Sequence, residues 1–421
     1  MSERPGVAAR LHGLLVELFG VVPPVRIIAW DGSDVGSADG PTVRVHSRKA
    51  VRRLLWSPGE LGLARAYVAG EVDIDGDLTT AMRELADYGS RIGSTPTLTA
   101  AKRREIMRTA VLVGAVGPAP RPPREELGPH EHASGARERV AAAAHASTAM
   151  GAISDILGGT LAYSCGWFDG PGSSLDEAQE AKYERICANL DLRPGMRLLD
   201  VGCGWGGLLV HAATRYGVEA VGVVRDADRA ELVRGRLSEV GVSDRVEVRL
   251  GDFRAVEDGP YDAIAAIETT EHLAPNDLVE YAARVQQLLR PGARVVHQQI
   301  TGQLSTESEA TFWSSYVQPD NRLFPLSALL RAFDDTGLET RRVLSMREHY
   351  PPTLQAWLTG LERRWDQVVE AVGPGRARVW RLSLALSTVG FERAAMSVHQ
   401  VLGVRPFADG RSGWRMPGEP A

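Results

Sequence analysis

Apolar and polar positions follow a regular pattern from residue 197 to the end of the chain. Apolar runs of five to eight residues alternate with longer segments in which apolar side chains recur on one helical face. The runs predict strands at 197–202, 219–224, 246–250, 261–268, 293–300, 339–346 and 398–404. Strands separated by helices indicate a mostly parallel sheet that helices cover on both faces. The pattern therefore predicts an α/β fold.

Three polar side chains fall near the ends of these runs. Glu268 and Glu271 close or follow the fourth run, and Gln298 lies near the end of the fifth. Ligands of open parallel sheets bind beyond the carboxyl ends of the strands. Because burying a carboxylate is costly unless a function requires it, the two glutamates mark a candidate site.

The first part of the chain has a different character. Residues 1–116 mix short strands, such as 24–30 and 41–47, with helical stretches, and they predict a smaller α+β domain. Residues 117–139 are rich in proline, glycine and charge, which is typical of an exposed linker. Because 421 residues exceed one compact core, we expect a second, catalytic domain over 140–421.

The composition is that of an ordinary globular protein, with 44% hydrophobic and 24% charged residues. The net charge of −5 gives no overall attraction for nucleic acid. The three cysteines form neither a disulfide framework nor a metal-site spacing, so we expect a reducing compartment and no bound metal. The sequence shows no apolar leader and no membrane-spanning stretch, which predicts a cytoplasmic protein.

A basic segment stands out in the first domain. Residues 47–56 place four basic side chains beside two leucines and a tryptophan. One interpretation is a peripheral contact with an anionic membrane surface. The other, which we favour, is a helix with a solvated basic face and a buried apolar face. The sequence leaves membrane contact open, and it also leaves a homodimer open.

A glycine-rich turn, "LLDVGCGWGG", joins the first predicted strand of the sheet to the next helix. Glycines let the backbone turn tightly and approach a ligand, and the helix N-terminus supplies free N–H groups. The spacing is D-x-G-x-G-x-G rather than the dinucleotide pattern G-x-G-x-x-G. It resembles the motif of class I S-adenosylmethionine-dependent methyltransferases. The residues of the motif are Asp200, Gly202, Gly204 and Gly206.

Two further stretches bear on the same cofactor. The motif "GDF" fits the adenine contact of these enzymes, with Phe253 beside an Asp252 that accepts a hydrogen bond from the base. The second strand ends in two valines, so the ribose-binding acid usual at its end is either absent or supplied from further along the chain. Asp226, two positions later, either takes this role or only caps the following helix.

Longer motifs narrow the resemblance. The stretches "LAYSCGWFDGPGSSLDEAQEAK", "LRPGMRLLDVGCGWGG", "HYPPTLQAW" and "HQVLGVRP" are similar to motifs of the cyclopropane fatty acid synthase family, and the likeness covers essentially the whole chain. The resemblance implies a Rossmann-like, mostly parallel seven-stranded sheet with a smaller α+β N-terminal domain. It also implies S-adenosylmethionine as cofactor, S-adenosylhomocysteine as product, and cofactor contacts from Tyr163, Ser164 and Gln179.

In this family an alkene attacks the sulfonium methyl, and the resulting carbocation loses a proton to give a cyclopropane, a methylene or a methylated product. The resemblance implies a bound bicarbonate as base, held by a cysteine, a glutamate, a histidine, an isoleucine main chain and a tyrosine. The matching residues are Cys165, Glu271, Ile300 and Tyr350. Gln298 replaces the histidine, and His297, one position earlier, is expected to face the other way. This departure puts bicarbonate in doubt.

A second group of departures concerns the substrate. His145 keeps the family's identity, whereas five residues of a polar, aromatic run are changed, mostly to smaller side chains. The replacements are Ala146, Ser147, Met150, Ala152 and Ile153, and Ser383 stands where a tyrosine is usual. The expected effect is a wider pocket with fewer aromatic faces to stabilise a cation.

Glu268 has no counterpart in the family, which normally has a glycine there. One hypothesis is that its carboxylate occupies the place of the lost bicarbonate and acts as a built-in base. A second carboxylate nearby and a partly dry pocket would raise its proton affinity, which suits that role. The other hypothesis is that Glu268 binds a cofactor hydroxyl or ammonium group or pairs with an arginine.

We therefore predict an S-adenosylmethionine-dependent C1-transfer enzyme that forms a cyclopropane or adds a methyl group. The departures favour a bulkier, specialised metabolite as substrate, as in natural-product biosynthesis. A first alternative is the unsaturated acyl chain of a phospholipid, and a second is a non-catalytic homologue that acts as a partner subunit. The candidate catalytic residues are Glu268, Glu271, Cys165, Tyr350, Gln298 and His145.

Overall fold

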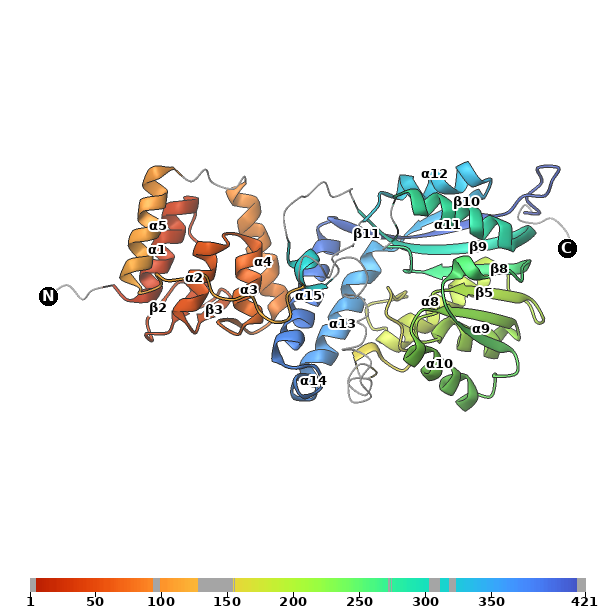
Figure 1. Cartoon of the computed structure of the whole chain (residues 1–421), viewed down its shortest axis with the longest axis horizontal. Helices are drawn as coiled ribbons and strands as arrows, with labels where there is room; N and C mark the ends of the chain where they lie inside the picture. Colours follow the sequence, from red (N-terminus) through yellow and green to blue (C-terminus); the bar gives the residue numbers. More distant parts are fainter. Residues whose placement is uncertain are drawn as a thin grey trace. The chain divides into compact units, whose positions relative to one another are not determined.

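The computed structural model describes most of the chain as two compact units (Figure 1). The described residues are 5–93, 99–127, 154, 156–271, 273, 275–302, 311–317 and 323–414. Unit 1 gathers residues 1–143, 307–320 and 364–389, and unit 2 gathers residues 144–306, 321–363 and 390–421. The linker predicted at 117–139 lies partly outside the described residues, and the boundaries proposed from the sequence stay predictions.

Unit 1 is built on a four-stranded sheet of order β2-β1-β3-β4. β1 and β3 are parallel, while the β1–β2 and β3–β4 pairs are antiparallel. The elements are α1 (Val7–Phe19), β1 (Arg26–Ala29), β2 (Asp34–Val35), β3 (Thr42–Val45), α2 (Arg48–Trp56), α3 (Glu60–Val68), β4 (Val72–Asp75), α4 (Leu78–Ile92), α5 (Ala100–Leu112), η2 (Trp313–Val317), α14 (Trp365–Val372) and most of α15 (Pro374–Glu392). β1 and β3 confirm the two strands predicted for this part. Alternate residues of β1, Ile27 and Ala29, pack with Ala8 of α1 in the core.

The basic segment forms the predicted helix, α2, but its two faces differ from the prediction. Arg53 is buried, because Glu71 neutralises it through hydrogen bonds of 2.8 and 3.0 Å. Arg52 donates to two main-chain carbonyl oxygens at 3.2 Å. The Trp56 side chain, expected in the core, is 61% exposed. Two of the basic side chains therefore stabilise unit 1, and membrane contact stays a prediction.

Unit 2 contains a seven-stranded sheet of order β10-β11-β9-β8-β5-β6-β7. The strands from β9 to β7 run parallel, and β11 is antiparallel to both of its neighbours. The elements are α8 (Leu175–Leu190), β5 (Arg197–Val201), α9 (Gly207–Tyr216), β6 (Glu219–Val224), α10 (Ala227–Glu239), β7 (Val246–Leu250), η1 (Phe253–Ala255), β8 (Tyr261–Ile267), α11 (Pro275–Leu288), β9 (Leu289–Gly302), α12 (Leu326–Thr336), β10 (Glu339–Ser345), η3 (Arg347–His349), α13 (Tyr350–Arg363) and β11 (Met396–Val404). All seven strands predicted for this part are confirmed.

Side chains of the central strands alternate between two cores. Leu198 of β5 belongs to a cluster with α8, α9 and α10, and Leu199 belongs to a second cluster with α11 and α12. Helices therefore cover both faces of the sheet, as Figure 1 shows for unit 2. This is the α/β, mostly parallel architecture that the sequence predicts. The turns that follow β5 and β8 carry the glycine motif and Glu268.

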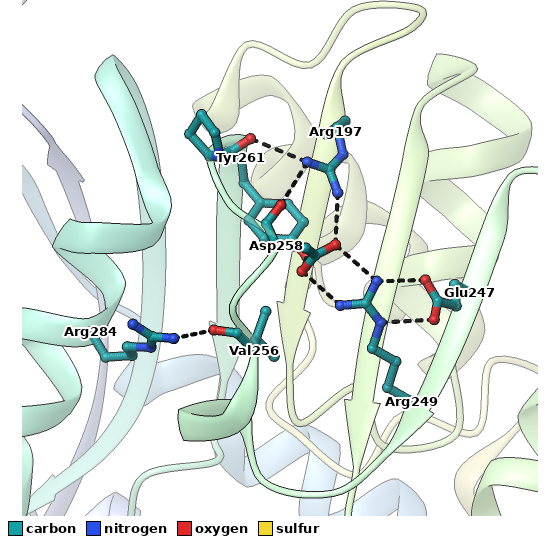
Figure 2. A network of polar contacts seen from close by, with 8 residues as sticks. Arg197, Glu247, Arg249, Val256, Asp258, Tyr261 and Arg284 are labelled. Atoms are coloured by element: carbon teal, nitrogen blue, oxygen red, sulfur yellow. Dashed lines mark hydrogen bonds and ion pairs between the residues drawn. The ribbon is translucent and has the colours of Figure 1, made fainter.

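An ion-pair network ties the first residues of β5 and β8 to β7 (Figure 2). Asp258, just before β8, accepts hydrogen bonds from Arg197 at 3.0 Å, Arg249 at 2.7 Å and the Tyr261 hydroxyl at 2.8 Å. Arg249 also binds Glu247 at 2.8 and 2.6 Å. These hydrogen bonds, above all from Arg249, hold the pKa of Asp258 well below its usual range. Arg197 and Tyr261 begin β5 and β8, at the ends of these two strands opposite to Glu268, so the network stabilises the sheet and is not part of the Glu268 contacts.

Candidate active site

Glu268 follows β8 directly and has an unusual backbone conformation. Its φ is +51°, in the left-handed region. A non-glycine residue pays roughly 1–2 kcal/mol there, which explains why a glycine would be the ordinary choice at this position. The Glu268 N–H donates to the Gln298 carbonyl oxygen at 2.7 Å, which fixes the turn against β9.

Three donors converge on the Glu268 carboxylate. Oε1 accepts from the Cys165 N–H at 3.0 Å and from Nε2 of Gln298 at 2.7 Å, and Oε2 accepts from the Tyr350 hydroxyl at 2.6 Å. These donors come from a loop before α8, from β9 and from the start of α13. None of them is an arginine. The structure thus brings together four of the six predicted catalytic residues.

Glu271 is buried and Glu268 is partly buried, and the charge of Glu268 acts on Glu271. Burial raises the pKa of Glu268, and the hydrogen bonds from Tyr350, Cys165 and Gln298 oppose this rise only in part. Oε1 of Glu271 accepts from the Ile300 N–H at 2.9 Å. Burial, together with the charge of Glu268, raises the pKa of Glu271 to about 8. A carboxyl group whose pKa is raised toward neutral pH in this way can exchange a proton at physiological pH.

Gln298 and His297 face opposite sides of the sheet, as strand alternation predicts. Gln298 reaches Glu268, whereas the His297 ring contacts Tyr281 at 2.9 Å and Thr270 at 3.2 Å. His297 is fully buried, and desolvation lowers its pKa to about 4. It is therefore a neutral core residue.

Cys165 contributes its main chain rather than its thiol to the Glu268 contact. Its Sγ lies 3.3 Å from the Gly166 carbonyl oxygen, and burial raises the pKa of the thiol well above its usual value. The next N–H, of Gly166, donates to the Thr353 hydroxyl at 3.0 Å, which ties this loop to α13. A protonated, buried thiol is a poor nucleophile, so we infer that Cys165 positions the carboxylate.

Lys182 organises the "YSC" loop from α8. Its Nζ donates to Oγ of Ser164 and to Oε1 of Gln179, both at 2.7 Å, and the Gln179 amide donates to the Ser164 carbonyl oxygen at 2.9 Å. All three residues are buried. Desolvation lowers the pKa of Lys182 to about 8, although Glu268 and Asp200 favour its charged form. Ser164 and Gln179 thus hold the loop that carries Cys165, and their cofactor contact stays a prediction.

The glycine motif forms the turn from β5 to α9. Its three glycines have φ between +56° and +79°, which a side chain rarely adopts. A Cβ on Gly202 would lie 2.4 Å from the Thr269 side chain, so the turn also needs a glycine for space. Asp200, the acid ahead of the glycines, is buried, and desolvation raises its pKa to about 7.

Polar atoms around this turn suit a bound polar cofactor. Nε1 of Trp205 and Oγ1 of Thr269 are buried and lack a hydrogen-bond partner within the described part of the chain. Such orphaned groups are uncommon in native proteins and indicate a ligand. Beside them the Tyr163 ring is 64% exposed and stacks on Trp357 with ring centroids 5.1 Å apart. An open aromatic face next to a glycine turn fits a sulfonium cofactor.

The other predicted cofactor residues have structural contacts as well. Asp226 caps α10 by accepting from the Arg229 N–H at 2.8 Å, which is one of the two roles weighed from the sequence. Asp252 caps η1 and forms an ion pair with Arg225. Phe253 is buried and packs edge-on against Tyr281 at 5.3 Å. Their cofactor roles therefore stay predictions.

Some predicted residues cannot be placed in the site. His145 and the replaced run 146–153 lie outside the described residues. Ser383, expected near the substrate, belongs to unit 1, where its hydroxyl donates to the Trp380 carbonyl oxygen at 2.8 Å. No helix among the described residues is long and apolar enough to cross a membrane.

Sequence reasoning gave no role to several residues that shape the site. Lys182, Thr353 and Gln400 act through side-chain pairings that depend on the fold. The available signal was polarity in an apolar setting, because Gln400 interrupts the otherwise apolar run of β11 and Lys182 lies on the buried face of α8.

A solved structure assigns the chain to a known class. The cyclopropane synthase CmaA1 complexed with SAH and CTAB matches with a TM-score of 0.58 and 25% identity, covering 62% of this chain and 95% of that chain. With the strand order and the glycine turn, this match defines an enzyme of the class I S-adenosylmethionine-dependent methyltransferases.

Sequence comparisons narrow the class to a family. A family model described as mycolic acid cyclopropane synthetase matches residues 138–401. A probable fatty acid methyltransferase of Mycobacterium tuberculosis (strain ATCC 25618 / H37Rv) is 32% identical over 403 residues, covering 91% of each chain. A tuberculostearic acid methyltransferase of the same organism is 29% identical, covering 90% of this chain and 87% of its own. The chain belongs to the cyclopropane synthetase family, which confirms the resemblance found in the sequence.

Proposed function

We propose that this enzyme transfers a one-carbon unit from S-adenosylmethionine to the double bond of an unsaturated acyl chain, with Glu268 as its resident base. The observation that carries the proposal is the convergence of Cys165, Gln298 and Tyr350 on the Glu268 carboxylate. The family resemblance implies that the cysteine and the tyrosine at the matching positions hold a bicarbonate. Here the same two positions hold a carboxylate that belongs to the chain.

The residues of the site support each part of this chemistry. The glycine turn, Trp205 and Thr269 would hold S-adenosylmethionine, which would supply an electrophilic methyl group. Attack by the alkene would leave a carbocation on the substrate, and the Glu268 carboxylate and the aromatic faces of the site would stabilise this charge. Glu268 then accepts one proton from the substrate. Tyr350 and Gln298 orient the carboxylate for that step and favour its ionised form.

Two departures from the family are explained together by this arrangement. Glu268 supplies the carboxylate that bicarbonate would otherwise bring, and Gln298 supplies an amide donor where the family has a histidine. The left-handed backbone at Glu268 is strained, and strain of this kind is usually kept where a function needs it. Bicarbonate is therefore not required as a cofactor in the mechanism that we propose.

Two arguments favour an acyl chain as the substrate: the names of the relatives and the explanation just given for the two departures. The relatives that match over most of both chains are named as methyltransferases of fatty acids. The loss of the histidine and the presence of Glu268 at first favoured a specialised metabolite. Both are explained if Glu268 replaces bicarbonate as the base. The smaller side chains at 146–153 still favour a second candidate, a bulkier alkene.

The test is methyl transfer by the purified enzyme. It should be incubated with S-adenosylmethionine carrying a trideuterated methyl group, together with vesicles of unsaturated phospholipid or a panel of bulkier alkenes. A product that retains all but one of the deuterium atoms shows proton loss from the transferred carbon. Glu268→Gln should abolish product while the protein still binds the cofactor. Turnover by Glu268→Gln would refute the base, and cofactor binding without turnover on any substrate would indicate the partner-subunit alternative.

A further inference from the structure

A row of side-chain amides leads from the surface of unit 2 to Glu268. Nη1 of Arg342 donates to Oδ1 of Asn189 at 3.0 Å, and Nδ2 of Asn189 donates to Oε1 of Gln400 at 3.0 Å. Nε2 of Gln400 donates to Oε1 of Gln298 at 3.3 Å, and Nε2 of Gln298 donates to Glu268 at 2.7 Å. We call Asn189, Gln400 and Gln298 the amide chain.

The fold holds the amide chain in place. Gln298 and Gln400 are direct partners across the antiparallel β9–β11 pair, so their side chains leave the same face of the sheet. Gln298 is fully buried and Gln400 is 3% exposed. Asn189 lies near the end of α8, and Arg342 lies on the edge strand β10. Two amides buried in a central sheet are costly unless each makes its hydrogen bonds.

The direction of the hydrogen bonds in the amide chain follows from its first member. An arginine side chain can only donate, so Arg342 requires the oxygen of Asn189 to face it. The nitrogen of Asn189 then faces Gln400, whose nitrogen in turn faces the oxygen of Gln298. Only the nitrogen of Gln298 remains for Glu268, which can only accept when it is ionised. The donor at the surface and the acceptor in the site thus require the same orientation.

We propose that Asn189 and Gln400 are positioning residues that keep the N–H groups of Gln298 turned toward Glu268. Neither residue contacts Glu268 among the interactions described, and both act through the orientation of one amide. The proposal rests on the proposed function, because it assumes that Glu268 must be ionised to take a proton. It adds that groups on α8 and β11, away from the reacting atoms, help to set the pH at which this ionisation occurs.

Other groups also face Glu268 and must be held constant in a test. Lys182 of α8 favours the charged carboxylate, and Tyr350 of α13 donates to it. The charge of Glu268 also raises the pKa of three groups in the adjoining loops: Cys165, Tyr163 and Glu271. The most informative change is therefore one that leaves all of these groups in place and reverses only the direction of the hydrogen bonds in the amide chain.

Asn189→Asp makes this change with almost no change in shape. The new carboxylate accepts from Arg342 and also demands a donor from Gln400, so the amide of Gln400 turns and its oxygen faces Gln298. Gln298 can then no longer satisfy both Gln400 and Glu268. The ionised form of Glu268 is disfavoured, and the acid limb of the rate–pH profile should move to higher pH by about half to one unit.

Two matched variants separate this effect from a simple change of charge. Ala188→Asp adds the same charge one residue away, on an exposed position of α8, and should leave the acid limb in place. Gln400→Leu interrupts the amide chain, so Asn189→Asp should lose its effect in that background. A direct spectroscopic measure is the infrared band of the protonated Glu268 carboxyl, identified by its absence in Glu268→Gln. In Asn189→Asp this band should persist to higher pH.

The outcomes distinguish the two proposals. If Glu268→Gln is inactive but Asn189→Asp leaves both the acid limb and the infrared band unchanged, the positioning role is refuted and the proposed base stands. If Asn189→Asp acts equally in the Gln400→Leu background, or no more strongly than Ala188→Asp, its effect is long-range charge and the positioning role is again refuted. Full turnover by Glu268→Gln refutes the proposed function itself. Variants are compared only where cofactor binding and melting temperature match those of the parent.

Discussion

The Tyr350 hydroxyl donates to Oε2 of Glu268 at 2.6 Å, while the Tyr350 ring stacks on Phe391 with centroids 4.2 Å apart. The ring therefore stays in place when the hydroxyl is removed. Tyr350→Phe should take one donor from the carboxylate without opening a cavity, which raises the pKa of Glu268 further. We expect roughly a tenfold lower rate near neutral pH and an acid limb moved upward. Rate–pH profiles of the two proteins check this, and an unchanged acid limb would speak against a role for the hydroxyl.

Glu268→Gly should convert the site to one that depends on an added anion. Glycine adopts the left-handed backbone without strain, so the fold should be kept or slightly stabilised. The lost carboxylate leaves the donors of Cys165, Gln298 and Tyr350 without an acceptor. Bicarbonate added to this inactive variant should restore a measurable part of the rate.

The control for this rescue is Glu268→Gln, whose amide still fills the space. Bicarbonate should not restore the activity of that variant. The measurement is the rate of product formation against bicarbonate concentration at fixed pH and ionic strength. Equal rescue of both variants, or of neither, would contradict the idea that Glu268 stands in the place of the anion.

Glu271 should make the folded state less stable as pH rises. Its pKa is about 8 in the folded protein and about 4.5 as the ordinary value, so the folded state binds more protons between these pH values. The free energy of unfolding therefore falls with pH across this window. Glu271→Gln keeps an acceptor for the Ile300 N–H and should remove this part of the slope, on the order of a few kcal/mol. Denaturant unfolding of both proteins from pH 5 to 8 compares the slopes; parallel curves would show that Glu271 is not the cause.

The ion-pair network of Figure 2 should affect stability without affecting chemistry. Asp258→Asn removes the charge that Arg197 and Arg249 share, and because the side chain is 40% exposed we expect a loss of only about 1 kcal/mol. The pKa of Asp258 is depressed, so its contribution is present above the unfolded pKa and is lost as pH falls. The difference in unfolding free energy between the two proteins should therefore shrink in acid. The rate–pH profile at 25 °C should be unchanged, since a shift would link this network to the site.

Much of the fold could be predicted because its signals are local. The seven strands of unit 2 are apolar runs bounded by turns, and the glycine motif has a fixed spacing. Alternation along β9 was enough to separate Gln298 from His297. The position of Glu268 after β8 made it a candidate before any contact was known.

The remaining features depend on contacts between residues far apart in sequence. Glu268 gives no sign that its backbone is left-handed, because the residue type disfavours that conformation. Cys165 contacts Glu268 through its main-chain N–H, which every residue except proline carries. Its thiol therefore suggests thiol chemistry, whereas the contact is a main-chain hydrogen bond. Gln400 pairs with Gln298 only through the register of β9 and β11, which a single sequence does not reveal.

In the mechanism that we propose, the base is a side chain, so the enzyme does not depend on a supply of bicarbonate. Dissolved bicarbonate follows the carbon dioxide content and the acidity of the medium, so an enzyme that borrows it shares those fluctuations. A side chain is present in one copy per site at all times. An enzyme built in this way should work equally well in gas-stripped buffer and in buffer equilibrated with carbon dioxide at the same pH.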